Sequence, residues 1–262
     1  MDFSSVEEHR SRDLIEYLDF GSRLSMDDKL KTFAIQQLGP GMSVLDVGCG
    51  TGDDVRAIAD IVGRQGRVAG TDPNPAMIAE AMVRGTPDNA QFEVSPASAL
   101  PYRDATFDAV RADRVFQHIR EPDLAASELR RVTKPGGTAL LLDQDWGSLM
   151  ISGADPVVTR RVIGAFCEGL ARPWAGREAR GLLLKAGFAH VDYSATVSIP
   201  PFSTALVSVL IPAIETATAA GAIDGEGGRR WLDSLVKSEE RGAFFCGVVV
   251  VIALGVSRTT AA

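Results

Sequence analysis

The stretch "VLDVGCGTGDD", Val44 to Asp54, is the part of the sequence that most strongly decides the fold. Its first residues are apolar, as in a buried strand, and they lead directly into a glycine-rich turn. Three glycines at alternate positions allow the backbone to come close to a ligand. They are Gly48, Gly50 and Gly52. On this spacing alone, a phosphate, a dinucleotide and a sulfonium nucleoside all remain candidate ligands.

The residues after the glycines narrow this choice. A phosphate-binding P-loop needs a Lys after its last glycine, and none follows here. Asp53 and Asp54 stand where the next helix begins, so we expect them to act as N-terminal caps and partners of the helix dipole. Two carboxylates there would repel the pyrophosphate of a dinucleotide. Asp72 ends the next strand, about 20 residues further on, where a carboxylate can accept hydrogen bonds from both hydroxyls of a ribose. The pattern favours a nucleoside ligand without a phosphate.

Strand and helix patterns alternate from residue 43 onward. Strands are expected at 43–47, 67–72, 90–95, 107–112 and 138–145, and helices at 53–63, 74–84 and 123–132. This alternation indicates an α/β fold, with a parallel sheet and helices on both faces. After residue 150 the rhythm changes. A helical stretch at 155–171 and two or three helices at 202–238, broken near Pro212, indicate a helical cap, and the Val-rich strand 244–256 closes the chain.

This pattern divides the chain into a single domain with a cap. The expected segments are an N-terminal helical cap segment (1–38), a nucleoside-binding core (39–148), a cap insertion (149–178), a core helix and strand (179–199), a second helical cap insertion (200–240) and the final core strand (241–262).

Composition excludes several classes of function. The net charge of -7, without a basic cluster, disfavours nucleic acid as a partner. Cys49, Cys167 and Cys246 lack CxxC spacing, which favours a reducing cytoplasm and gives no metal site. The N-terminus "MDFSSVEEHRSRD" is too charged for a signal peptide, so a cytoplasmic location is expected. The most apolar run, 243–256, is shorter than the roughly 20 residues of a membrane-spanning helix and indicates a buried strand.

Four sequence segments, in a fixed order and at fixed spacing, resemble the motifs of a known protein family. They are "VLDVGCGTGDD", "VAGTDPNPAMIAEA", "SALPYRDATFDAV" and "ELRRVTKPGG". In this order and spacing they resemble the class I S-adenosylmethionine-dependent methyltransferases, and most of all the group that modifies quinones, polyketides and other small natural products. The resemblance covers residues 40–145 and, more weakly, 176–197. It implies a Rossmann-like, doubly wound and mostly parallel seven-stranded sheet with an antiparallel last strand.

The resemblance also implies which residues bind the cofactor, S-adenosyl-L-methionine. They are Asp46, Gly48, Gly50, Thr51, Asp72, Met77, Ala97, Ser98 and Asp113. The glycine turn would lie under the methionine moiety, and the backbone carbonyl of Asp113 would face its amino group. Asp72 would hold the ribose, and Met77 would pack on the adenine. The family usually has an Asp where this sequence has Pro96. Either Ser98 or backbone atoms replace its bond to the adenine, or the adenine is held more by packing.

The acceptor side must supply alignment, exclusion of water and, for some nucleophiles, a general base. Ligands of open α/β sheets bind at the carboxyl ends of the strands, so candidates are sought there. His118 is either a base or substrate-orienting group or a loop histidine that caps a helix. Asp145, expected at the end of the fifth strand, either binds a hydroxyl, acts as a base or forms a turn. Trp146 either stacks on a flat substrate or packs in the cap.

Two cap features complete the predicted site. Phe202 and Leu206 lie at helical spacing, and we expect their helix both to fill the cap and to roof an apolar substrate pocket. Tyr17 either folds over the cofactor or packs within the cap.

Three enzyme classes fit this fold. The leading hypothesis is methyl transfer to an oxygen, nitrogen or carbon of a small, largely apolar or aromatic molecule. A cyclisation or rearrangement that uses the same cofactor is the second, and an NAD(P)-dependent reductase is the third. A homodimer is compatible with the sequence.

Overall fold

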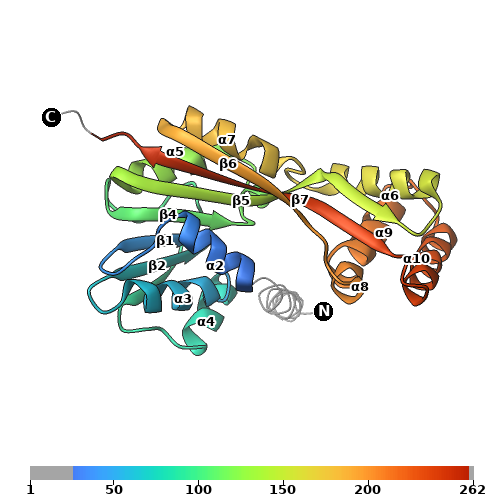
Figure 1. Ribbon diagram of the computed structural model, residues 1–262, viewed down its shortest axis with the longest axis horizontal. Helices are drawn as coiled ribbons and strands as arrows, with labels where there is room; N and C mark the ends of the chain where they lie inside the picture. The colour runs from blue at the N-terminus through green and yellow to red at the C-terminus, as the bar shows by residue number, and fades with distance from the viewer. Residues whose placement is uncertain (1–25, 260–262) are drawn as a thin grey trace, which may run out of the picture.

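The computed structural model describes residues 26–259, which contain one seven-stranded sheet with the order β3-β2-β1-β4-β5-β7-β6 (Figure 1). The strands are β1 (Ser43–Val47), β2 (Arg67–Asp72), β3 (Ala90–Val94), β4 (Phe107–Asp113), β5 (Thr133–Ser152), β6 (Phe188–Ser198) and β7 (Phe245–Ser257). The strands from β3 to β5 run parallel, and β7 runs antiparallel to both of its neighbours. The predicted mostly parallel sheet with an antiparallel last strand is confirmed.

Helices cover both faces of this sheet. They are α2 (Met26–Ile35), α3 (Asp53–Val62), α4 (Pro75–Val83), α5 (Pro122–Val132), α6 (Pro156–Gly169), α7 (Ala175–Lys185), α8 (Phe202–Ala205), α9 (Ile211–Ala219) and α10 (Gly225–Glu240), with a 3-10 turn η1 (Phe116–His118) and a π-helical turn η2 (Leu206–Leu210). Local sequence sets several helix starts. In α4, for example, Pro75 stands in the first turn and the Asn74 side chain accepts the N–H of Ala76.

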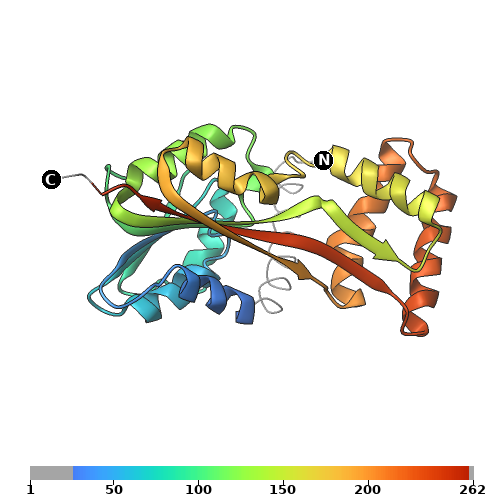
Figure 2. The ribbon, with the colours of Figure 1, turned by 45° about the horizontal axis from the view of Figure 1, so that its top comes forward.

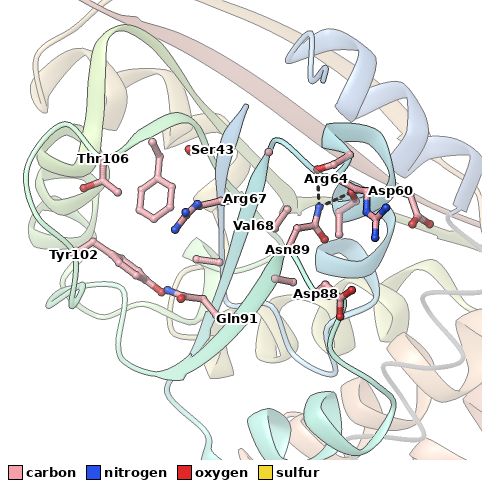
Figure 3. Close-up of a pocket in the computed structure, with 16 residues that line it drawn as sticks. Ser43, Asp60, Arg64, Arg67, Val68, Asp88, Asn89, Gln91, Tyr102 and Thr106 are labelled. Carbon is pink, nitrogen blue, oxygen red and sulfur yellow. Dashed lines mark hydrogen bonds between the residues drawn. The ribbon is translucent and has the colours of Figure 1, made fainter. Parts of the chain in front are cut away.

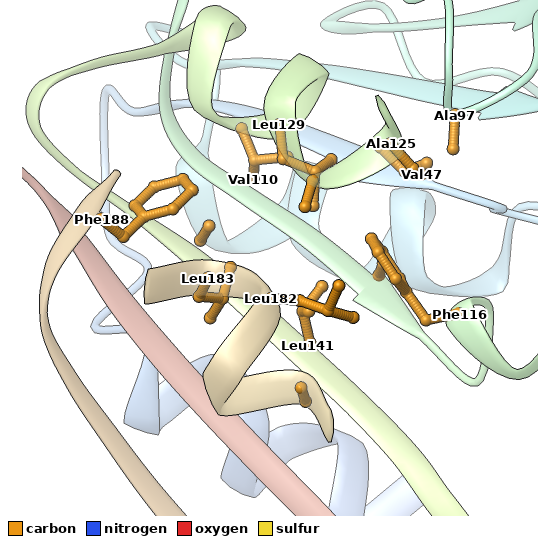
Figure 4. Close-up of a cluster of buried hydrophobic side chains, with 14 of the residues drawn as sticks. Val47, Ala97, Val110, Phe116, Ala125, Leu129, Leu141, Leu182, Leu183 and Phe188 are labelled. Carbon is orange, nitrogen blue, oxygen red and sulfur yellow. The ribbon is translucent and has the colours of Figure 1, made fainter. Parts of the chain in front are cut away.

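The core lies on both sides of the central strands. Val44, Leu45 and Val110 on β1 and β4 are fully buried, as expected for strands covered on two faces. Against one face, α5 and α7 place side chains such as Leu129 and Leu183 in a single apolar cluster (Figure 4). Burial of this apolar surface is the main stabilising contribution, and it fixes the strand ends that carry the site.

The strand β5 is much longer than the sequence suggested. It was expected to end at residue 145, but it runs on to Ser152, with an irregularity between Asp145 and Met150. The reason is β7, which pairs with residues 138–145 and, beyond the irregularity, again with residues 150–152. Asp145 therefore lies inside the strand rather than at its end, and Trp146 belongs to the strand rather than to the loop predicted for it.

The helices α6, α8, α9 and α10 form a cap at the far ends of β5 and β7, away from β1 to β4 (Figure 1 and Figure 2). The cap has its own apolar cluster, which includes Val162, Leu210, Trp231 and Leu235. The predicted break near Pro212 is absent. Instead, the π-helical turn η2 joins α8 to α9, and Pro212 lies in the first turn of α9, where its missing N–H is tolerated.

By length and hydropathy alone, the helical stretch Phe202–Ala219 would be long and apolar enough to cross a membrane. In the structure this stretch is a cap helix whose α9 portion packs against α6, and 28% of it is buried. The other apolar run, around β7, is a sheet strand as predicted.

Candidate functional site

The cavity that we call the main cavity, because it holds most of the predicted site residues, has a volume of about 720 Å³. It lies at the carboxyl ends of β1, β2 and β4, beside Gln144 and Trp146 of β5 and against the cap. Most of the predicted site residues line it. They are Asp46, Gly48, Gly50, Thr51, Asp72, Met77, Ala97, Ser98, Asp113, His118 and Trp146. Tyr17 lies outside the described residues. The position agrees with the rule that open α/β sheets bind ligands where the strands end.

The glycine turn forms the floor of the cavity. Gly48 has a positive φ of 71°, and a Cβ there would lie 2.5 Å from the Val115 side chain. Gly52 has a φ of 81°, and a Cβ there would lie 2.6 Å from the Phe92 ring. Because both positions need a left-handed backbone and leave no room for a side chain, glycine is required at each.

The acids at the start of α3 act differently from the prediction. The cap of α3 is Gly52, with no side-chain cap, and Asp53 and Asp54 lie in the first helical turn. They are therefore not N-terminal caps. The glycine occupies the cap position because only it readily adopts the left-handed backbone there. Both carboxylates still place negative charge at the positive end of the helix, which makes this turn unsuitable for a phosphate.

Asp72 is held in place by backbone groups on two loops. Its Oδ2 accepts the N–H of Gly50 at 3.1 Å, and its Oδ1 accepts the N–H of Asn74 at 2.9 Å. Partial burial raises the pKa of Asp72 above its usual value. Each carboxylate oxygen can accept a further hydrogen bond, so the group is preorganised for a pair of hydroxyls.

A buried arginine, which the sequence analysis did not single out, lies beneath the part of the cavity formed by the glycine turn and Asp72. Arg111 is fully buried in β4, and its Nη2 lies 3.1 Å from Asp54 Oδ2 and 3.5 Å from Asp113 Oδ2. Its Nε lies 3.5 Å from Asp46 Oδ1. The guanidinium also sits 4.5 Å from the centre of the Phe33 ring. One cation thus links acids from β1, α3 and β4. The signal was visible as a charge inside the otherwise apolar strand "FDAVRA".

The turn η1 brings His118 to the part of the cavity that faces the cap. The N–H groups of Phe116 and Gln117 both donate to the carboxylate of Asp143, at 3.2 Å each. Asp143 is fully buried on β5, and burial raises its pKa well above the usual value. The His118 side chain is exposed toward the cavity, and desolvation by the surrounding protein lowers its pKa. It is therefore mainly neutral near neutral pH and able to accept a proton.

Trp146 forms a buried aromatic wall of this half. Its Nε1 donates to Gln117 Oε1 at 2.6 Å, and its ring meets the edge of Phe166 with centroids 5.3 Å apart. These contacts fix the orientation of the indole. Phe166, Leu170 and Pro212 from the cap complete an apolar lining on this side.

The structure does not bring three of the predicted residues into the cavity lining. Asp145 points to the opposite face of β5 from Gln144, as alternation along a strand requires. There Arg177 of α7 donates to both of its oxygens, with Nη2 2.7 Å from Oδ1. The carboxylate is thus engaged away from the substrate position.

Phe202 and Leu206 pack within the cap, with the Phe202 ring 4.8 Å from that of Phe244. The cavity is lined instead by Val207, Ser208 and Pro212 of the same helical stretch. The predicted face packs in the apolar cluster of the cap, and the neighbouring face of the same helical stretch lines the cavity.

A second cavity, of about 820 Å³, opens at the amino ends of β1 to β3 (Figure 3). Its walls are polar and include Asp60, Arg64, Arg67 and Asp88. The Asn89 amide beside them already donates to the carbonyls of α3 and its cap. The cavity lies at the edge of the sheet opposite the glycine turn, so we assign the function to the main cavity. Within residues 26–259, no group of three His, Cys, Asp or Glu is placed to hold a metal ion.

Comparison with known proteins agrees with this geometry. The protein-family model named "Methyltransferase domain" matches residues 44–137 of the sequence. An uncharacterized 37.1 kDa protein in transposon TN4556 of Streptomyces fradiae is 33% identical over 249 residues, which cover 92% of this chain and 70% of that protein. The ubiquinone/menaquinone biosynthesis C-methyltransferase UbiE of Hahella chejuensis is 35% identical over 119 residues. The chain belongs to the class I S-adenosylmethionine-dependent methyltransferases.

The match to UbiE covers 43% of this chain and 48% of the relative, so it spans about half of that enzyme. Solved structures show the same fold at low identity. The YcgJ protein of Bacillus subtilis has a TM-score of 0.61 at 17% identity over 89% of this chain and 99% of its own. The [4+2]-cyclase SpnF has a TM-score of 0.55 at 23% identity over 88% of this chain and 80% of its own.

The cavity fits the cofactor of this methyltransferase family. Gly48 and Gly50 present backbone to the cavity, and Asp72 presents a carboxylate that two backbone N–H groups hold in place. The surrounding acids suit a ligand that carries a sulfonium and an ammonium and no phosphate. S-adenosyl-L-methionine is therefore the cofactor.

Proposed function

We propose that the protein methylates a small, largely apolar or aromatic molecule held between the strand ends and the cap. The supporting observation is the division of one cavity into two unlike halves. Acids and glycines surround one half, whereas Trp146, Phe166, Leu170 and Pro212 surround the other. A charged, cationic donor and an apolar acceptor would thus be placed side by side and shielded from water.

We propose the following cofactor contacts. Asp72 holds the ribose hydroxyls, while Met77 and Ala97, which are almost fully buried, form the apolar slot for the adenine beside Ser98. Gly48, Gly50 and Thr51 lie under the methionine moiety with Asp46. The carbonyl of Asp113 faces its amino group. When bound, S-adenosyl-L-methionine supplies an electrophilic methyl group.

On the acceptor side, the chain's own residues orient the acceptor and exclude water. His118 is the group suited to accept a proton from an acidic acceptor, since its neutral form is favoured. Asp145 is not proposed as a base, because Arg177 occupies its carboxylate. The UbiE relatives are named as C-methyltransferases of quinone biosynthesis, so a hydroquinone or phenol ring is the first acceptor class to test.

The test is transfer of labelled methyl from S-adenosyl-L-methionine to a panel of hydroquinones, phenols and aromatic amines. We expect label in at least one product and release of S-adenosylhomocysteine. Turnover of a polyene or quinone substrate without label would instead indicate a cyclase or rearrangement enzyme, as the name of SpnF suggests for that protein. If NADH bound more tightly than S-adenosylhomocysteine, both the methyltransferase and the cyclase or rearrangement function would be contradicted.

A further inference from the structure

Two glutamines line the acceptor half of the cavity, and only one of the two amide oxygens has a hydrogen-bond partner. Gln117 is fully used: its Oε1 accepts the indole N–H of Trp146 at 2.6 Å, and its Nε2 donates to the carbonyl of Arg114 at 3.1 Å. Gln144, on β5, also lines the cavity. Its Oε1 is shielded from solvent and has no hydrogen-bond partner in the structure.

The position of Gln144 is set by the sheet. It pairs with Val250 of β7, just before the irregularity that follows Asp145. Its side chain lies on the face opposite Asp143 and Asp145, whose carboxylates are bound by η1 and by Arg177. The amide therefore has none of the partners that its two acidic neighbours have.

A shielded acceptor without a partner is unfavourable, and buried polar groups in folded proteins are almost always paired. Such a group is retained where a ligand supplies the missing donor. Sites that hydrogen-bond a substrate hydroxyl or amine also reject analogues that lack it, because the site's own polar group is then left unpaired.

We propose that Gln144 determines acceptor specificity. Its half-buried side chain lines the cavity, and its amide turns the oxygen toward a bound acceptor and accepts a hydrogen bond from an O–H or N–H of the substrate. This rests on the proposed function and sharpens it. The acceptor is a flat, mostly apolar molecule that carries a hydroxyl or amino donor, as a phenol, hydroquinone or arylamine does, rather than a pure hydrocarbon or fully oxidised quinone.

The first experiment measures stability. Gln144→Met removes an unpaired group and keeps the volume, so we expect the melting temperature to stay unchanged or to rise by about 1–4 °C. The matched variant Gln117→Met leaves the Trp146 indole without its acceptor, and we expect its melting temperature to fall by about 2–6 °C. A fall for Gln144→Met as large as that for Gln117→Met would show that its amide is structurally paired and would overturn the proposal.

The second experiment measures recognition in protein loaded with S-adenosylhomocysteine. The probes are 2-naphthol, 2-methoxynaphthalene and 2-methylnaphthalene, which share a ring system and differ in the donor. We expect the ratio of the 2-naphthol to the 2-methylnaphthalene association constant to be about 10-fold larger in the wild type than in Gln144→Met. Taking this ratio of ratios cancels the different hydration of the probes.

Other outcomes overturn the proposal. An unchanged ratio would assign donor recognition to another residue. Equal binding of 2-methoxynaphthalene and 2-naphthol would mean that the amide presents its N–H, not its oxygen. Binding of S-adenosylhomocysteine is measured in the same samples. Its absence from the wild type would count against the proposed function, whereas normal cofactor binding and label transfer with an unchanged probe ratio would remove only the role of Gln144.

Discussion

The two halves of the cavity are held together by different physics. In the cofactor half, one buried guanidinium, Arg111, links Asp46, Asp54 and Asp113, and backbone N–H groups fix Asp72. In the acceptor half, neutral groups dominate. A glutamine amide orients an indole there, and the cap supplies apolar walls. The charged half is built for one cationic cofactor, whereas the neutral half can be altered by single substitutions without disturbing the charge balance.

The largest effect is expected when the buried cation of the cofactor half, Arg111, is removed. Arg111→Met leaves the linked carboxylates without their buried counter-ion, so we expect the free energy of unfolding to fall by about 3–5 kcal/mol. Urea denaturation at neutral pH measures this change.

The matched control is Arg230→Met on α10. Its ion pair with Glu226 is mostly exposed, so its loss should cost less than about 1 kcal/mol. If Arg111→Met cost no more than this control, the network would be a consequence of the fold rather than a support for the cofactor half.

The next largest effect concerns Asp72. Asp72→Asn removes a charged acceptor aimed at the ribose, so we expect the dissociation constant for S-adenosylhomocysteine to rise by about 10- to 100-fold. Isothermal titration calorimetry measures it. Asp88→Asn, in the second cavity at the opposite edge of the sheet, should leave the constant unchanged. A weaker complex for Asp88→Asn with a normal one for Asp72→Asn would move the cofactor to that second cavity.

The same contrast explains what the sequence could predict. The glycine turn and the first turn of α3 are adjacent in sequence, and Asp72 ends the neighbouring parallel strand β2, 22 residues after Gly50. A single strand–helix–strand unit brings them together, so the motif spacing was enough to predict that they meet. Arg111 was overlooked although a charge within a buried strand is a clear signal. Its role could not be predicted, because only the structure shows that its three acidic partners lie on three different elements.

The acceptor half was harder because its residues depend on distant pairings. The extent of β5, and hence the faces of Gln144 and Asp145, is set by β7, which lies about 100 residues later in the chain. The apolar face that contains Leu206 was expected both to fill the cap and to roof the cavity, whereas it packs in the cap and the adjacent Val207 and Ser208 line the cavity. Sequence periodicity predicts which helix face is apolar, but not which neighbouring face meets a cavity formed by distant strands.

A smaller effect tests the reassignment of Asp145. Asp145→Asn weakens the contact with Arg177, whose side chain is about half exposed, so we expect a loss of only about 1 kcal/mol in the free energy of unfolding. Methyl transfer and cofactor affinity should stay at the wild-type level, because the carboxylate faces away from the cavity. A rate loss of about 100-fold with unchanged stability would instead return Asp145 to the acceptor site as a general base.

The smallest expected effect is the pH dependence due to His118. Its pKa in the folded protein is lowered by desolvation, so its contribution to stability is fully present above the unfolded pKa of about 6.5 and is lost as the pH falls through the folded value. The wild type should therefore lose stability relative to His118→Gln when the pH is lowered from about 8 to about 5. Paired thermal melts across this range measure the difference, which stays small because the ring is exposed toward the cavity. A growing advantage of the wild type at low pH would mean that the imidazolium has an anionic partner, and the acceptor half would then share the charged character of the cofactor half.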